Sequence, residues 1–371
     1  TAQGNQDGNS IGDFYYEPPS GYLALCTSNL AAPEIALPTD HFNTVLWAGD
    51  DADDRAITGV GFQPDFTWNK RRSTSGNHQL QDSIRGASEV MASNYELGEW
   101  TEANSTKSFD SDGFTVGTDS NINGSGVTYV AWCWKGGGAA ASNIDGTITS
   151  SVSANPTAGF SIVKWTGTDS NVTVGHGLSQ APDLIINKSM GNDYNWAVQS
   201  ILWNSPSDTN MMYLNTTAAQ ADDTNVFQAA PTATVFSPQG GAWAGIGTDT
   251  IDYIAYCFHS VEGYSKIGSY TGNADADGAF VYCGFRPSFL IAKNYGASSK
   301  PWVMYDDKRD TYNEMYKQLV ANDNAAADTS EGRLDFVSNG IKWRIGDSYH
   351  NDGSFIYLAF AESPFKTSNA R

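Results

Sequence analysis

The chain contains two sequence landmarks, and each of them occurs three times in the same order. The first landmark contains a Pro and ends in a Lys, at residues 61–70, 181–188 and 284–293. The second has the form Tyr-apolar-Ala-aromatic and begins at Tyr129, Tyr253 and Tyr357. The Pro residues are 118 and 105 residues apart, and the Tyr residues are 124 and 104 apart. Such nearly constant spacing indicates one structural unit that is used three times.

The composition favours strands over helices. Only 17% of the residues are charged, 12% are aromatic, and 37 are Gly. Short apolar and aromatic runs alternate with Gly, Asn and Asp, which is typical of strands joined by tight turns. Many short strands at regular spacing predict antiparallel sandwiches. We therefore expect an all-β protein with three tandem antiparallel β-sandwich modules of the jelly-roll or concanavalin-like type.

The landmarks divide the chain into an N-terminal extension and three modules, at residues 1–43, 44–142, 143–262 and 263–371. The first module ends in a linker of Gly and Ala at residues 136–142, so we expect it to be joined more loosely than the other two. Residues 22–26 match the second landmark. They are the last strand of a preceding domain or a strand lent to the first module, and a chance match of five residues is the third alternative.

The charge of the chain limits its partners. The formal net charge is −20 and the pI is about 4.4. Such a field repels phosphate backbones and anionic lipids, so nucleic acid and membrane surfaces are not expected as partners. The chain also lacks an apolar run long enough to predict a membrane span.

The four Cys residues are expected to be free and mostly buried. Cys133 and Cys257 occupy the same place in two different modules, which predicts that they lie too far apart to form a disulfide. Free thiols of this kind indicate folding in a reducing cytosol.

The sequence predicts no catalytic residues, no metal centre and no cofactor. The five His residues are scattered and lack the clustered spacing of zinc ligands. Residues 273–278 resemble the start of a calcium-binding loop, but Gly284 stands where such a loop needs a Glu. A solvated hairpin turn is the favoured interpretation, and calcium stays open as a cofactor. Repetition itself argues against an enzyme, because catalytic sites are usually single.

An Asp and an Arg recur together in two of the modules. Asp82 and Arg85 in the first module correspond to Asp306 and Arg309 in the third. We interpret each couple as an ion pair that braces a turn. The second module has Ser200 and Trp203 at these places, so the pair is not obligatory.

The repeats sort the aromatic residues into core and candidate site residues. Trp132, Tyr256 and Phe360 share one place in the three modules, which predicts buried core positions, with the preceding Ala of each on the opposite face. Three Trp residues lie in loop-like segments without an aromatic counterpart, and these are the candidate ligand-binding residues: Trp100, Trp203 and Trp243. Sugar rings stack on exposed aromatic faces, so we expect a glycan there.

Several segments resemble tandem modules of bacteriophage virion proteins, which are frequent in marine and cyanobacterial phages. The resemblance covers about residues 14–371 and is carried by residues 61–66, 83–86, 112–114, 129–132 and 359–366. It implies a tail fibre, a tail spike or a capsid-surface protein with concanavalin-like or jelly-roll sandwiches. By analogy with phage fibres it also implies a homotrimer. It supplies no catalytic residue.

The function expected from these observations is host attachment by a non-enzymatic phage virion surface protein that binds host glycan. Its partners would be a host cell-surface glycan and other virion proteins. It would be synthesised and assembled in the host cytoplasm and would end on the virion surface. Two alternatives remain, a purely structural capsid decoration module and a polysaccharide depolymerase.

Overall fold

The regular secondary structure of the chain is almost entirely β-strand, as the sequence predicts. The computed structural model describes residues 3–30, 32–202, 209–222, 225–241 and 245–367. In these ranges the named strands form six antiparallel sheets, and the one α-helix is the short α1 (Ser120–Asn123). The predicted all-β class with antiparallel sandwiches is confirmed. No helix among the described residues is long and apolar enough to cross a membrane.

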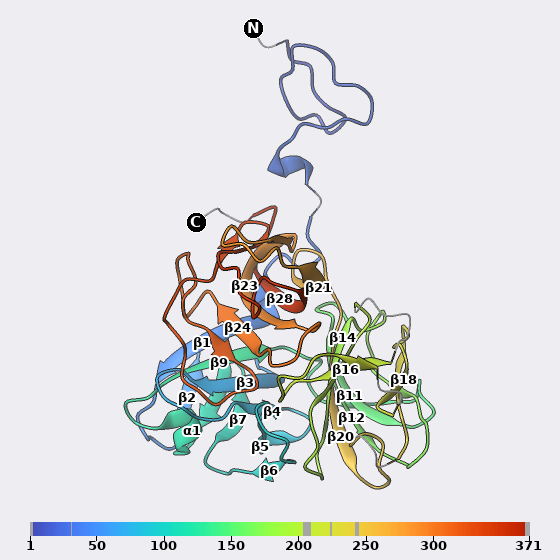
Figure 1. Ribbon diagram of the computed structural model, residues 1–371. Helices are drawn as coiled ribbons and strands as arrows, with labels where there is room; N and C mark the ends of the chain where they lie inside the picture. The colour runs from blue at the N-terminus through green and yellow to red at the C-terminus, as the bar shows by residue number, and fades with distance from the viewer. Residues whose placement is uncertain (1–2, 31, 203–208, 223–224, 242–244, 368–371) are drawn as a thin grey trace.

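Each larger sheet is accompanied by a three-stranded sheet, and we call the two together a sheet pair (Figure 1). The larger sheet of the first pair has the order β1 (Phe42–Ala48), β9 (Thr128–Trp134), β3 (Phe66–Arg71), β4 (Gln79–Asp82), β5 (Gly86–Met91) and β6 (Trp100–Thr101). Its smaller sheet has the order β2 (Arg55–Thr58), β8 (Gly113–Val116) and β7 (Thr106–Asp110).

The second and third sheet pairs repeat this arrangement. The larger sheet of the second pair has the order β10 (Ala141–Asn143), β11 (Ser150–Asn155), β12 (Phe160–Thr166), β20 (Asp252–Phe258), β14 (Leu184–Ser189), β15 (Ala197–Ser200), β16 (Asn210–Tyr213) and β17 (Ala221–Asp222). Its smaller sheet contains β13 (Val174–Gly175), β19 (Val235–Pro238) and β18 (Phe227–Ala229). The larger sheet of the third pair contains β21 (Ser265–Thr271), β28 (Ser354–Pro364), β23 (Phe285–Asn294), β24 (Trp302–Asp306) and β25 (Leu319–Val320). Its smaller sheet contains β22 (Phe280–Tyr282), β27 (Gly340–Trp343) and β26 (Leu334–Val337).

The two sequence landmarks lie side by side in every larger sheet. Strands β9, β20 and β28 carry the Tyr landmark, and each of them pairs with the strand that carries the Pro landmark, namely β3, β14 and β23. The repeated sequence therefore encodes a repeated strand order. Whether the three pairs superpose as three separate modules stays a prediction.

One face of each larger sheet packs on the smaller sheet of its own pair. The same aromatic contact occurs between the strand that flanks the Tyr landmark (β1, β12 or β21) and the middle strand of the smaller sheet. The ring centroids are 5.8 Å apart for Trp47 and Phe114, 6.4 Å for Trp165 and Phe236, and 6.0 Å for Tyr270 and Trp343. These contacts make the interior of each sandwich.

The opposite faces of the three larger sheets pack on one another. Trp132, Tyr256 and Phe360 are buried, as predicted, and they belong to one hydrophobic cluster that spans all three pairs. Ala131 and Ala359 belong instead to the interiors of the first and third pairs. The shared aromatic place is therefore buried between the sheet pairs, because strand alternation puts neighbouring residues on opposite faces.

The expectation that the first module is loosely joined is wrong. Phe66 of the first pair stacks on Tyr256 of the second at 4.2 Å between ring centroids, and Trp132 lies 5.4 Å from Phe289 of the third. Residues 141 and 142, at the end of the expected linker, belong to strand β10 of the second pair. Composition alone suggested flexibility, whereas aromatic packing fixes the first pair to both of the others.

The three pairs form a closed ring through equivalent backbone hydrogen bonds. The N–H of Glu99 in the first pair donates to the carbonyl of Met190 in the second at 2.8 Å. The N–H of Gln220 in the second pair donates to the carbonyl of Tyr295 in the third at 2.9 Å. The N–H of Ala327 in the third pair donates to the carbonyl of Arg72 in the first at 2.9 Å. A head-to-tail contact repeated in this way closes a ring with no free interface.

A buried ring nitrogen makes a second contact at each of these interfaces. Trp196 Nε1 donates to the carbonyl of Ala92 at 2.9 Å, and Trp302 Nε1 donates to that of Tyr213 at 3.0 Å. In the first pair His78 takes this role, with its Nε2 3.0 Å from the carbonyl of Val320. His78 Nδ1 accepts from Trp68, so Nε2 carries the proton, and burial holds the pKa of His78 well below its usual value.

The two Asp–Arg pairs are confirmed, and each of them also serves the neighbouring sheet pair. Arg85 Nε lies 2.5 Å from Asp82, and Arg309 Nε lies 2.5 Å from Asp306. The hydroxyl of Tyr256 donates to Asp82 at 2.8 Å, and Trp132 Nε1 donates to Asp306 at 3.0 Å.

The second sheet pair has no such Asp–Arg ion pair, and the chemistry of the shared aromatic place explains why. Phe360, the third member of that place, has no donor, and the second pair carries Ser200 where the others carry Asp. An aromatic residue without a polar atom needs no acceptor in the neighbouring sheet, so the buried carboxylate is dispensable there.

The Lys that ends each Pro landmark is buried. Lys70 Nζ donates to the carbonyls of Asn324 and Ala325 in the third pair, at 3.1 and 2.8 Å. Lys188 Nζ donates to the carbonyl of Glu96 in the first pair at 3.0 Å, whereas Lys293 Nζ bonds within its own pair. Burial lowers the pKa of each of these three Lys residues from 10.5 to about 8.

The N-terminal extension projects from the ring (Figure 1). Asp7 organises it, since its carboxylate accepts hydrogen bonds from the backbone of Asn9, Ile11 and Ala24 and from the Asn29 side chain. These bonds lower the pKa of Asp7 to about 2, against the opposing effect of its desolvation. Residues 22–26 form no strand, so the interpretation of a strand lent to the first module is wrong.

Replacement of Tyr256 by Phe should destabilise the protein by about 1–3 kcal/mol, because Asp82 loses a buried hydrogen-bond donor. The free energy of unfolding, measured by denaturant titration, tests this. The same change at the exposed Tyr312 is the control and should have almost no effect. Equal effects of the two changes would contradict the assigned contact.

Replacement of Lys188 by Met should change the pH dependence of stability. Its pKa is about 8 in the folded chain and about 10.5 in the unfolded chain, so between these values the unfolded chain binds the extra proton. The stability of the native sequence relative to Lys188→Met should therefore rise by roughly 1 kcal/mol from pH 8 to pH 9. Denaturant titrations at both pH values measure it, with Lys164→Met as the surface control. A difference that falls with pH would contradict the burial of the Lys188 charge.

Candidate functional site

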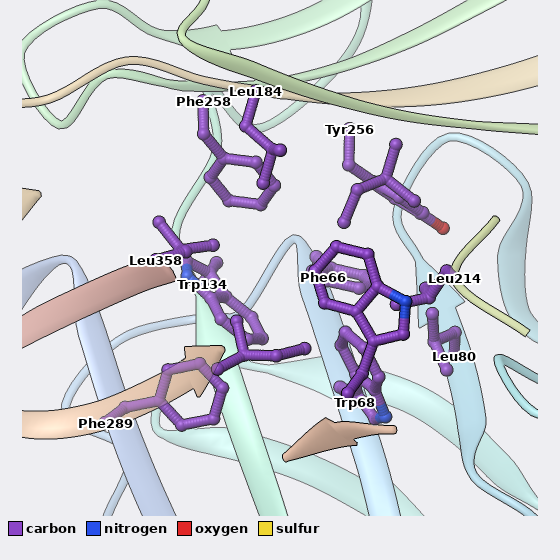
Figure 2. A pocket seen from close by; sticks show the side chains of 13 residues that line it. Phe66, Trp68, Leu80, Trp134, Leu184, Leu214, Tyr256, Phe258, Phe289 and Leu358 are labelled. Atoms are coloured by element: carbon purple, nitrogen blue, oxygen red, sulfur yellow. The ribbon is translucent and has the colours of Figure 1, made fainter. Parts of the chain in front are cut away.

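The cavity at the centre of the ring is too small to hold a ligand. Its volume is about 20 Å³, and Figure 2 shows aromatic and aliphatic side chains from all three larger sheets converging on it. Its lining includes Phe66, Trp134, Leu184, Phe258, Phe289 and Leu358. A space of this size would hold about one water molecule, and this lining offers little to bind it. The centre of the ring is therefore a packed hydrophobic core and not a binding site.

A larger open groove lies where the first and second sheet pairs meet. Its volume is about 840 Å³, which is in the range of pockets for small molecules. The polar side chains that line it are His41, Gln63, Asp65, Ser111, Lys135 and Asn155. They come from five separate segments, and residues 136–139 form much of the remaining wall.

Glycines let the chain pass closely along this groove. A Cβ on Gly137 would lie 2.3 Å from the carbonyl oxygen of Ala154, so no other residue fits without a backbone shift. The N–H groups of Gly136 and Gly138 donate to the Asp65 carboxylate at 2.8 and 3.3 Å. Burial raises the pKa of Asp65, and these bonds oppose that effect. Asp65 therefore holds the glycine segment in place.

His41 lies at the same groove, and its surroundings lower its pKa. Asn155 Nδ2 lies 3.0 Å from His41 Nδ1 and also donates to the carbonyl of Lys135 at 3.1 Å. Burial and the nearby charge of Lys135 lower the pKa of His41, and Asp40 acts in the opposite direction. The groove thus presents amide, imidazole, hydroxyl and ammonium groups, which suit hydrogen bonding to a polar ligand.

The sequence does not predict the groove, because the residues that line it are far apart in the chain. Two signals in the sequence do point to it. Asp65 belongs to the Pro landmark, and residues 136–138 are three consecutive glycines. The sequence predicts a flexible linker at these glycines, whereas their close packing beside Ala154 makes them part of the wall of the groove.

Only one of the three candidate Trp residues can be placed. Trp100 lies in the edge strand β6, opposite Val90 of β5, and its side chain is neither fully buried nor fully exposed. It does not line the groove. Trp203 and Trp243 lie outside the described residues. The structure therefore does not bring the three together, and Trp100 stays a candidate by itself.

The calcium-like loop is organised as a turn by its own side chains. Asn273 Oδ1 accepts from the N–H of Asp275, and Asp275 Oδ1 accepts from the N–H of Asp277. The Asp277 carboxylate pairs with Lys342 at 2.6 Å. In the described part of the chain, no group of three or more His, Cys, Asp or Glu side chains is placed to hold a metal ion.

A family model described as a domain of unknown function (DUF7483) matches residues 37–364. The chain belongs to this family. The match begins before β1 and ends with β28, so the DUF7483 domain comprises the whole ring of sheet pairs. Comparison with curated proteins and with solved structures found no match.

Proposed function

We propose that this DUF7483 protein is a non-enzymatic virion surface protein of a bacteriophage, which attaches the particle to its host by binding a cell-surface glycan. The observation that carries this proposal is the open polar groove on an interlocked ring. A ring without loose interfaces keeps its surface fixed, and pre-formed polar surfaces bind with little loss of conformational freedom. The resemblance of the repeated segments to phage virion modules supports the same assignment.

The extension is the part of the chain suited to contact another virion protein. It carries several exposed apolar side chains away from the ring, namely Tyr15, Tyr16, Tyr22, Leu23 and Leu25. Exposed apolar patches of this kind mark protein contacts. In this proposal the extension holds the particle and the ring faces the host, and a homotrimer follows by analogy with phage fibres. The alternative of a purely structural decoration protein would use the same extension without a ligand.

Incubation of the protein with purified host polysaccharide tests the proposal. Retention of the protein on the immobilised polysaccharide without new reducing ends supports attachment. New reducing ends would contradict the proposal in favour of a depolymerase. Failure of every host polysaccharide to retain the protein would contradict it in favour of decoration. Double replacement of Gln63 and Lys135 by Ala should weaken retention, because both side chains are exposed in the groove.

Replacement of Trp100 by Ala should weaken adsorption to host cells by about tenfold, which corresponds to about 1.4 kcal/mol. The melting temperature should change little, since Trp100 lies in a two-residue edge strand. Adsorption assays and thermal unfolding measure the two effects, with replacement of the exposed Tyr349 by Ala as the control at another surface aromatic. A large fall in melting temperature with unchanged adsorption would make Trp100 a packing residue.

A further inference from the structure

Two of the ring interfaces differ at one equivalent position. Glu99 and Ala327 each follow, by five residues, an Asn whose side chain accepts an N–H at the start of a strand. Asn94 accepts from His78, just before β4, and Asn322 accepts from Trp302, the first residue of β24. The N–H of Glu99 and that of Ala327 also make the same contact with the neighbouring pair. The two residues therefore occupy the same place in the first and third sheet pairs.

At the interface between the first and second pairs, this place is filled by a carboxylate. Glu99 lies 3.1 Å from Arg85, whose Nη1 also donates to the carbonyl of Glu89 at 3.1 Å. The opposing backbone belongs to Met190. The arginine of this interface thus has an internal anion as its partner.

At the interface between the third and first pairs, the carboxylate is missing and positive charge is added. Arg309 is held like Arg85, since its Nη1 donates to the carbonyl of Lys317 at 2.6 Å. Lys317 therefore takes the place of Glu89, and Ala327 takes the place of Glu99. Arg72 takes the place of Met190. In a chain of net charge −20, two cations and an Ala stand here in place of two acidic side chains and a Met.

The space left by the missing carboxylate is open to solvent. A cavity of about 280 Å³ is lined by Arg72, Ser73, Thr128, Arg309, Lys317, Ala326, Ala327 and Thr329. Arg72 Nε is buried, and the described residues give it no hydrogen-bond acceptor. Burial and the nearby charge of Arg309 lower the pKa of Arg72, and Asp306 acts in the opposite direction. An anion in the cavity would relieve this unfavourable arrangement.

The acidic side chains around the cavity already have partners. Asp306 is bonded to Arg309. Asp310 lies 3.2 Å from Lys317, which also donates to the carbonyl of Arg309. Asp328 pairs with Arg333 at 2.5 Å. None of these carboxylates is bonded to Arg72, so Arg72 is the group that an external ligand would satisfy.

We propose that this cavity binds the carboxylate of a uronic acid residue in an acidic glycan. The carboxylate would lie near the cations, in the place that Glu99 fills in the equivalent interface. Planar guanidinium groups suit carboxylates, and the hydroxyls of Ser73, Thr128 and Thr329 suit the hydroxyls of a sugar ring. The choice of a sugar rests on the proposed glycan-binding function, whereas the choice of a carboxylate rests on the cavity alone.

Binding of galacturonate to the full chain, measured by isothermal titration calorimetry with galactose as the neutral comparison, tests this inference. The native sequence should bind galacturonate at least tenfold more tightly than galactose. Arg72→Met installs the residue of the equivalent interface and should weaken galacturonate binding at least tenfold. Ala327→Glu installs the internal carboxylate and should abolish binding while raising the melting temperature. Lys107→Met is the control, since Lys107 pairs with Asp53 and Asp54 outside the cavity and should bind normally.

Normal binding of galacturonate by a folded Ala327→Glu variant would overturn the site. N-acetylaspartate could instead bind more tightly than galacturonate and lose its binding in the Ala327→Glu variant. That result would contradict the assignment of a sugar ligand and would indicate an acidic protein partner. The outcome is distinguishable from that of the proposed function. Adsorption to host cells through a neutral glycan would support the proposed function and contradict the carboxylate site. Binding of galacturonate in this cavity without adsorption to host cells would support the carboxylate site and contradict the proposed function.

Discussion

The structure depends on the packing of aromatic side chains between the three larger sheets. Each larger sheet is buried on both faces: one covers the smaller sheet of its own pair, and the other meets the neighbouring pairs. Strand alternation assigns residues to these faces, so that Ala131 faces the sandwich interior and Trp132 faces the ring. Phe42, Trp134 and Phe360 continue this contact across pairs, with ring centroids at most 5.7 Å apart. Without this second buried face, each pair would be an isolated sandwich.

Buried polar groups decide how the ring closes. Four aromatic donors that face a neighbouring sheet have acceptors there, and each would otherwise cost about 1–3 kcal/mol as an unpaired buried donor. Trp134 Nε1 is buried without such an acceptor among the described residues. Tyr256 and Trp132 find carboxylates, and Trp196 and Trp302 find backbone carbonyls. These bonds fix the register of each interface, while the apolar packing supplies most of the area. The interfaces are therefore equivalent in backbone geometry and different in side-chain chemistry, which is where a repeated scaffold can acquire a binding site.

The sequence predicted the repeated unit, the all-β class, the burial of the shared aromatic place and the two Asp–Arg pairs. Each of these follows from local pattern, since a period of two puts Ala131 and Trp132 on opposite faces whatever lies beyond the sheet. It did not predict the closed ring, because nothing local says whether the second face of a strand meets solvent or another sheet. It also missed the groove, whose side chains come from five segments, and it mistook the fixed glycines at 136–138 for a loose linker. The candidate Trp100 rests on the lack of an aromatic counterpart in the other repeats, and that signal does not identify neighbours in space.

The central claim is that the three sheet pairs form one cooperative unit rather than three linked domains. Differential scanning calorimetry of residues 37–364 tests this claim most directly, since a unit without intermediates gives a calorimetric enthalpy equal to the van't Hoff enthalpy. A closed ring predicts one transition with equal enthalpies, because loss of one pair exposes the aromatic faces of the other two. Two or three separate transitions, or a van't Hoff enthalpy near one third of the calorimetric value, would contradict the ring.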